Sequence, residues 1–387
     1  MNKILKLLSI GLFCLISHAA IANSSPVDLI VKPAMTQFMN QYAIPGAAVL
    51  IYHDGHMYAY YFGVSNLKSN TPVTGQTIFE LGSITKTFTG LLLAEGIQSG
   101  SVKLSTPLGS LLRTGQNYST DIRRIPLLDL ATHTSSLPDN VSNIAYNAPA
   151  NSQTQARLNR FLNGWHAPYP MGSREIYSNF AFGLLGIALA DHAHKSLAQL
   201  MKNTILLPLG MKNSGLFVPV QNYAEGYSAD GKPVTSPQVG LLAGAWAMKA
   251  SVNDMQAYLK AAMLLPGTPP NILTLMKSTQ MGYFRYADYP LQNGLGWQIT
   301  PLANVDISSL MQVGAHYNHV PMAMVRIDPP VFVQNSLIDK TGTTDGFRAY
   351  IGVLPERQDG IVIMINRSIA NSGAMLNQAR KILFALD

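Results

Sequence analysis

The sequence predicts an α+β fold, a mixed α/β architecture. One antiparallel sheet is built from both termini and flanked by helices, with an inserted, mostly helical lobe. Alternating apolar segments separated by turn residues occur at 47–63 and again at 336–366. Between them, from about residue 98 to 220, apolar residues recur mainly with helical spacing. Because the strands come from both ends of the chain, a cleft is expected between the sheet and the inserted lobe.

The N-terminal 22 residues have the features of a secretory signal peptide. Lys3 and Lys6 form a basic start, the apolar run "LLSIGLFCLI" is too short to span a bilayer, and Ala20–Ala22 provides small residues for cleavage. The alternative is a lipoprotein anchored at Cys14, which bulky Phe13 disfavours. We therefore expect a periplasmic protein whose signal peptide, residues 1–22, is removed. The predicted parts are a mature domain at 23–387, with a sheet lobe at about 23–82 and 220–387 and a helical lobe at about 83–219.

The predicted elements follow in order along the mature chain. Val27–Tyr42 has helical periodicity, and "AAVLIYHDGHMYAYYFG" reads as two strands joined at Asp54-Gly55, a strong hairpin signal. Thr87–Ile97 is expected to be a helix, and Tyr223–Val239, rich in Gly, Ser and Pro, a long surface loop. Further predictions are helical segments at 179–193 and 196–210, strands within 336–342, 347–355 and 360–366, and an amphipathic helix at 372–387.

Composition excludes several classes of function. Charged residues make up 12% of the chain, against roughly 25% in typical globular proteins. The formal net charge of +7 is dispersed without any run of Lys or Arg, which disfavours nucleic-acid binding. Cys14 is the only cysteine, so the mature chain has no disulfide, thiol nucleophile or cysteine metal site. No later stretch looks transmembrane, so no membrane partner is expected after cleavage, and a monomer is the default.

The stretch "FELGSITKTFTG", residues 79–90, places Ser83 and Lys86 three residues apart at the start of an apolar helix. A lysine there opposes the helix dipole and cannot complete a capping box. A serine becomes a nucleophile only when a nearby base takes its proton. A partly buried lysine at a helix start loses its own proton more easily, through desolvation and the dipole. Ser83 and Lys86 are therefore a candidate nucleophile and base, with a purely structural role an equal alternative for this pair alone.

Three further short motifs bear on that choice. The Ser-x-x-Lys pattern recurs at Ser65 and Lys68, where turn residues predict a solvated loop. "YSN", Tyr177 to Asn179, offers a phenol that can relay protons and an amide that can donate and accept. "KTG", Lys340 to Gly342, occurs beside a strand and offers a fixed positive charge, the Thr341 hydroxyl, and a glycine against which a substrate can lie. Each is weak alone, since buried tyrosines and edge lysines are common.

Taken in chain order, Ser83-x-x-Lys86, "YSN" and "KTG" resemble the three motifs of the penicillin-recognising serine hydrolases. The Tyr-x-Asn form is similar to that of the class C β-lactamases, the cephalosporinases. The resemblance continues through "IPGAAV", "LLDLATHTS", "PLGMKNSG", "AWAMKASVNDM", "GLGWQI" and "KTGTTDGFRAYIGVLPE". It implies a β-lactamase/D-alanyl-D-alanine peptidase-like fold over the whole mature chain, β-lactam substrates and no cofactor.

The resemblance also implies a role for each matching residue. Ser83 would attack the lactam carbonyl and become acylated, while Lys86 and Tyr177 share the proton traffic. Asn179 would orient Lys86 and hold the substrate's side-chain amide. The backbone N–H groups of Ser83 and Thr343 would form the oxyanion hole. The remaining substrate-binding residues implied are Lys340 and Thr341 for the substrate carboxylate, Gly342, and Asn140, which aligns roughly with a glutamine on the substrate side.

Several positions depart from the usual class C pattern and put the substrate range in question. His133 and Trp246 stand where tyrosines are common, Arg348 replaces a small glycine, and Ser368 falls where an asparagine often assists with the carboxylate. "HTSSLP" also occurs in esterases and D-alanyl-D-alanine peptidases of the same fold. These enzymes remain alternatives, as does a non-hydrolysing penicillin-binding sensor that lacks the deacylation chemistry.

Two further sequence features are set aside. "EIYSN" from Glu175 superficially matches the class A glutamate motif but lacks its leucine and overlaps "YSN", so it is treated as coincidence. Metal binding is not expected, because the histidines occur without a matching carboxylate cluster. The histidine pairs considered are His192 and His194, His53 and His56, and His316 and His319.

Overall fold

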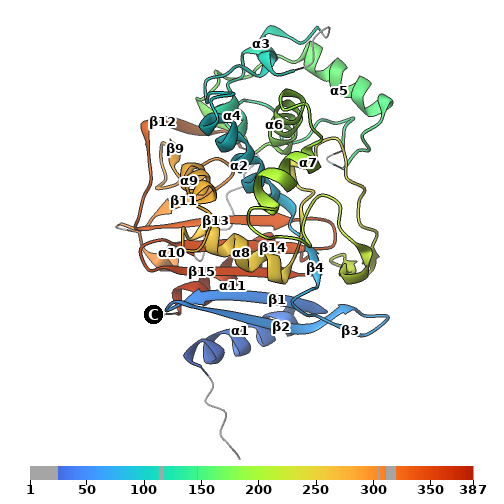
Figure 1. The fold of residues 1–387 in the computed structure, drawn as a ribbon, viewed down its shortest axis with the longest axis vertical. Coiled ribbons are helices and arrows are strands. Elements are labelled where there is room, and N and C mark those ends of the chain that lie inside the picture. The colour runs from blue at the N-terminus through green and yellow to red at the C-terminus, as the bar shows by residue number, and fades with distance from the viewer. Residues whose placement is uncertain (1–24, 113–116, 146, 304, 311–319, 387) are drawn as a thin grey trace, which may run out of the picture.

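The computed structural model describes residues 25–112, 117–145, 147–303, 305–310 and 320–386 (Figure 1). The predicted signal peptide at 1–22, the alternative anchor Cys14, and the pair His316 and His319 lie outside these residues. In the part of the chain that is described, no helix is long and apolar enough to cross a membrane.

An antiparallel sheet joins the two ends of the chain, as predicted. Its strand order is β3-β2-β1-β15-β14-β13-β11-β10-β9-β12-β5. The N-terminal strand β1 lies beside the C-terminal β15, with Ala47 opposite Ile365. The strands are β1 (Gly46–His53), β2 (His56–Asn66), β3 (Thr71–Pro72), β5 (Arg174–Glu175), β9 (Gly282–Tyr286), β10 (Gln292–Asn293), β11 (Gln298–Pro301), β12 (Met322–Val331), β13 (Ser336–Thr343), β14 (Arg348–Leu354) and β15 (Asp359–Ile365).

Two terminal helices cover one face of this sheet. They are α1 (Pro26–Tyr42) and α11 (Ser372–Phe384), both close to their predicted bounds. Ser25 caps α1 by accepting a hydrogen bond from the Asp28 backbone N–H at 3.1 Å. Buried apolar side chains of both helices, such as Met35 and Leu383, form one cluster with strand residues such as Ile363. This face is therefore closed, and the site must lie elsewhere.

A second, larger cluster joins the other face to the helical region drawn above the sheet in Figure 1. Helix α2 (Thr85–Gln98) and helix α6 (Asn179–His192) are buried almost all round, so both show apolar residues on every side. The remaining elements are α3 (Thr120–Arg124), α4 (Leu127–Ala131), α5 (Ser152–Gly164), α7 (Leu197–Met201), α8 (Val252–Ala262), α9 (Pro270–Thr279), α10 (Ile307–Leu310), β4 (Ile78–Glu80), β6 (Gly226–Tyr227), β7 (Pro233–Val234) and β8 (Lys249–Ser251). The predicted helices at 87–97 and 179–193, and the first part of that at 196–210, are confirmed. The boundaries of the two lobes remain a prediction.

The prediction of a purely surface loop at Tyr223–Val239 is wrong in part. The strands β6 and β7 pair within it, and Tyr227 is only 2% exposed. The Tyr227 hydroxyl donates to Glu225 and accepts from the Leu67 backbone N–H at 2.8 Å. The Gly-, Ser- and Pro-rich composition indicated turns correctly, but it gave no sign of these long-range contacts.

Candidate active site

The nucleophile candidate lies in a tight turn between β4 and α2. Residues Gly82–Ile84 form a 3₁₀ turn that runs directly into the helix. Gly82 has a φ of +51°, and a Cβ at this position would lie 2.4 Å from the backbone nitrogen of Thr343. Only glycine permits both the conformation and the approach. The turn therefore brings the Ser83 backbone against the end of β13.

The Ser83 hydroxyl contacts two of the predicted catalytic side chains. Lys86 Nζ lies 3.0 Å from Ser83 Oγ. The hydroxyl of Tyr177 donates to the same oxygen at 2.8 Å. Two groups able to exchange protons thus contact the one hydroxyl that the sequence marked as a nucleophile.

Lys86 is fully buried and held in one position. Its Nζ donates to the Asn179 side-chain oxygen at 2.6 Å and to the Ala245 carbonyl at 2.9 Å. Burial holds the pKa of Lys86 well below its usual range, and the positive charge of Lys340 lowers it further, while Asp139 acts in the opposite direction. A lysine with a lowered pKa can exist as a neutral amine, which is able to accept a proton.

Asn179 is oriented by a residue that sequence analysis missed. Its side-chain nitrogen donates to Asp139 Oδ1 at 2.9 Å, and its backbone N–H donates to the same oxygen at 3.3 Å. Asn140, by contrast, is exposed and donates to Asp139 Oδ2 at 2.9 Å. Asn140 is therefore linked to the Ser83 cluster through the Asp139 carboxylate that it shares with Asn179. Nothing in the isolated "SLPDN" pattern distinguished Asp139 as the anchor.

Strand β13 brings the KTG motif to the same place. Lys340 is buried, and its Nζ lies 5.5 Å from the centre of the Tyr177 ring. Thr341 is half-buried and Thr343 is exposed at the strand end. Gly342 packs directly against the chain before the nucleophile, because a Cβ there would lie 1.9 Å from the Leu81 carbonyl oxygen. All three motifs thus converge on one site.

His133, which departs from the class C pattern, packs against this site. Its ring centre lies 4.4 Å from that of Tyr177 and 5.0 Å from that of Phe182. Nδ1 accepts the Ser178 backbone N–H at 3.0 Å, which requires that nitrogen to be unprotonated. Burial, together with the charges of Lys86 and Lys340, holds the pKa of His133 well below its usual range. His133 is therefore a neutral support for Tyr177.

The other departures lie at different distances from the nucleophile. Trp246 is buried beside Ala245, which accepts from Lys86. The Arg348 guanidinium donates to the carbonyls of Thr344, Phe347 and Ile369 at 2.9–3.1 Å. Ser368 donates its backbone N–H to the Tyr227 carbonyl at 2.7 Å. Arg348 thus holds the 368–369 segment in place against β14.

Glu175, set aside as coincidence, is part of the same site. It lies on β5, two residues before Tyr177, and is 4% exposed. It lines a cavity of about 30 Å³ together with His133, Tyr177 and Lys340. The motif match itself was no guide, and the burial of Glu175 at the edge of the sheet gives no signal in the sequence.

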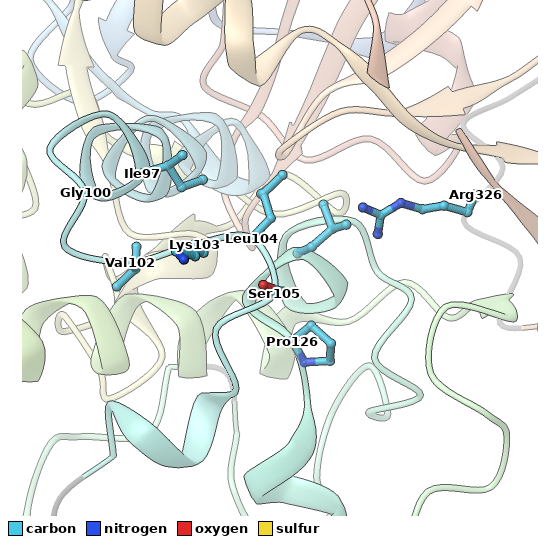
Figure 2. Close-up of a pocket in the computed structure, with 9 residues that line it drawn as sticks. Ile97, Gly100, Val102, Lys103, Leu104, Ser105, Pro126 and Arg326 are labelled. Atoms are coloured by element: carbon cyan, nitrogen blue, oxygen red, sulfur yellow. The ribbon is translucent and has the colours of Figure 1, made fainter. Parts of the chain in front are cut away.

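A separate cavity of about 530 Å³ contains none of the predicted site residues. It lies between the end of α2 and the chain around 102–105, where Ile97, Leu104 and Leu128 provide apolar walls and Arg326 reaches in from β12 (Figure 2). Within the described ranges, no group of three or more His, Cys, Asp or Glu residues is arranged to hold a metal ion.

Comparisons with known proteins agree with this geometry. The family described as Beta-lactamase matches residues 31–385. A beta-lactamase from Lysobacter lactamgenus is 30% identical over 372 residues, covering 93% of this chain and 94% of that protein. A beta-lactamase from Escherichia coli (strain K12) is 30% identical over 381 residues, covering 96% and 97%.

Solved structures show the same fold. The structure of a D-alanine carboxypeptidase from Burkholderia cenocepacia matches with a TM-score of 0.82 at 30% identity, covering 94% of this chain and 100% of that one. The structure of a beta-lactamase/D-alanine carboxypeptidase from Pseudomonas syringae gives a TM-score of 0.83 at 26% identity, covering 92% and 98%.

Proposed function

The chain belongs to the beta-lactamase family, and from this premise we propose that it is a periplasmic class C serine β-lactamase. It opens the ring of cephalosporins and penicillins through an acyl-enzyme on Ser83. The observation that carries the proposal is the double contact at Ser83 Oγ, made by Lys86 Nζ and the Tyr177 hydroxyl.

In the proposed acylation step, the Ser83 oxygen attacks the lactam carbonyl as its proton passes to Lys86 or Tyr177. The lowered pKa of Lys86 supports this role, because the amine is then able to receive the proton. The proton next goes to the lactam nitrogen as the ring bond breaks. The backbone N–H groups of Ser83 and Thr343 stabilise the developing oxyanion, a role supported by the close approach of Gly82 to Thr343.

Substrate binding is assigned to the residues around this centre. Lys340 and Thr341 bind the substrate carboxylate, and Gly342 lets the substrate lie along β13. Asn179, fixed by Asp139, holds the side-chain amide, and Asn140 lines the outer edge. In the second step, a water molecule activated by Tyr177 and Lys86 attacks the acyl carbonyl and releases Ser83.

A second candidate is a D-alanyl-D-alanine peptidase or esterase, favoured by the similarity to a D-alanine carboxypeptidase and to a beta-lactamase/D-alanine carboxypeptidase. Such enzymes, and a non-hydrolysing penicillin-binding sensor, share the acylation machinery and differ in how fast water removes the acyl group. The contacts at Ser83 described above serve all three.

The test uses the purified mature chain and a chromogenic cephalosporin. Colour is followed over many enzyme equivalents, and intact mass is recorded during and after the reaction. Sustained turnover with the mass returning to that of free enzyme is the expected result. A burst of one equivalent with a persistent adduct would instead assign a peptidase or sensor. No adduct and no turnover would overturn the β-lactam proposal and direct attention to ester substrates.

A further inference from the structure

A buried carboxyl group lines the same cavity as the predicted carboxylate-binding lysine. Glu175 Oε2 is buried and has no hydrogen-bond partner among the described residues. Its side chain accepts a hydrogen bond from Tyr286 of β9. A carboxyl group placed like this is costly to ionise, because burial removes its hydration and one of its two oxygens accepts no hydrogen bond within the described residues.

The surroundings of Glu175 connect it to the site. The small cavity of about 30 Å³ that it lines is also lined by Lys340 and Tyr177. This volume is sufficient for a single water molecule, which needs roughly 10–15 Å³ and several polar partners. The titratable groups facing Glu175 across the cavity are His133, Tyr177, Tyr286 and Lys340, and its strand partner on β12 is the uncharged Met322.

We propose that Glu175 is a positioning residue for substrate binding, which offsets part of the positive charge of Lys340 when ionised and no longer does so when protonated. This inference rests on the proposed function, since it takes Lys340 as the group that binds the substrate carboxylate. An ionised Glu175 weakens the attraction between Lys340 and an anionic substrate. The protonated form leaves the full attraction in place.

Glu175 can change its charge in the working range of the enzyme. Burial raises its pKa to about 7, while the Tyr286 hydrogen bond and the charge of Lys340 both act to lower it. His133 does not compete as a cation, because its pKa is held well below its usual range. The affinity for anionic substrates should therefore fall as pH rises through about 7.

The kinetic test compares Glu175→Gln with the unaltered enzyme, using a carboxylate-bearing cephalosporin from pH 5.5 to 8.5. At pH 5.5 the two KM values should agree, and at pH 8.5 the variant's KM should be lower by roughly tenfold. The kcat ratio should stay constant, since the effect is on binding in ground and transition states alike. Glu175→Asp should retain the pH step. Tyr286→Phe should move it to higher pH, because the lost hydrogen bond no longer lowers the pKa of Glu175.

Two controls separate this inference from a general structural effect. Glu356→Gln makes the same chemical change at an exposed position in the turn before β15 and should leave the profile unaltered. A neutral ester substrate should show no Glu175-dependent step in KM. Superimposable pH profiles for Glu175→Gln and the unaltered enzyme would overturn the proposal, as would an equal step with the neutral ester.

A measurement without substrate keeps the inference separate from the proposed function. The carboxyl resonance of Glu175 is followed by ¹³C NMR in glutamate-labelled free enzyme and assigned by its loss in Glu175→Gln. It should titrate near pH 7, and Lys340→Met should shift its midpoint upward. A shift in an enzyme that no β-lactam acylates would support the coupling while the β-lactamase proposal fails. No shift would overturn the coupling, whatever the enzyme hydrolyses.

Discussion

Residues 65–68 and 83–86 carry the same pattern, Ser-x-x-Lys, in two different surroundings. Ser65 is the last residue but one of β2, and its hydroxyl donates to the Thr71 carbonyl at 3.2 Å, while Lys68 is exposed in the following turn. Lys86 is fully buried, and its Nζ reaches Ser83 Oγ at 3.0 Å. On a strand that turns, the third residue after a serine points away. At the start of a helix, the two side chains lie on one face. The contact between serine and lysine thus depends on local geometry and burial more than on the Ser-x-x-Lys motif itself.

The largest effect is expected when the serine of each copy is replaced by alanine. Ser83→Ala should abolish the covalent adduct with a labelled penicillin and lower kcat by a factor on the order of 10⁴ or more, the scale seen when a serine nucleophile is removed. Ser65→Ala should leave both unaltered. Gel fluorescence and intact mass measure the adduct. A labelled penicillin still attached covalently to Ser83→Ala would refute the nucleophile assignment.

The second prediction concerns the two lysines. Lys86→Ala should slow acylation by roughly 10²–10⁴-fold, the usual contribution of a positioned base, whereas Lys68→Ala should leave it unchanged. Single-turnover acylation rates with a fluorescent penicillin provide the measurement, and circular dichroism confirms that both variants fold. Acylation by Lys86→Ala within about threefold of the unaltered rate would assign the proton transfer to Tyr177 alone.

The third prediction extends the comparison to the lysine of the KTG motif. Lys340→Ala should raise the KM of carboxylate-bearing substrates by roughly 10–100-fold, since hydrogen bonds to charged groups contribute about 1.5–3 kcal/mol. Neutral esters should lose much less. Michaelis constants for a matched acid and ester show the difference. An equal loss for both substrates would mean that Lys340 does not bind the carboxylate.

Sequence alone predicted the elements whose patterns are local. The hairpin at Asp54-Gly55, the helix starting beside Ser83 and the three C-terminal strands all follow from turn residues and periodicity. The short strands β9, β10 and β11 were not predicted, because two- to five-residue segments give little periodic signal. Likewise Ser83 and Lys340 stood out by motif, whereas Asp139 and Glu175 did not. Asp139 contacts Asn179, and Glu175 shares a cavity with Lys340, only because the fold brings segments that are distant in sequence together.

The smallest expected effect concerns the stability that buried acids give or remove as pH changes. Burial raises the pKa of Glu175 to about 7 and that of Asp129 to about 6. Both values exceed those of the unfolded chain, so the folded state holds these protons more tightly. The stability that these two protonated groups add to the free energy of unfolding is fully present below about pH 4. It is lost as pH rises through about 6 to 7. For Glu175 the loss amounts to about 3 kcal/mol at most.

Glu175→Gln should therefore flatten the decline in the free energy of unfolding between pH 5 and pH 8, as measured by urea denaturation. His133 contributes with the opposite sign at low pH, because its lowered pKa removes stability as pH falls. This term is common to both proteins and cancels in their difference. Lys68→Met, at the exposed copy of the motif, should change stability little at either pH. If Glu175→Gln and the unaltered protein lost equal stability over this range, Glu175 would already be ionised at pH 5. The site around Lys86 would then tolerate a buried negative charge. The difference between the two Ser-x-x-Lys copies would in that case come from the burial of Lys86 and not from Glu175.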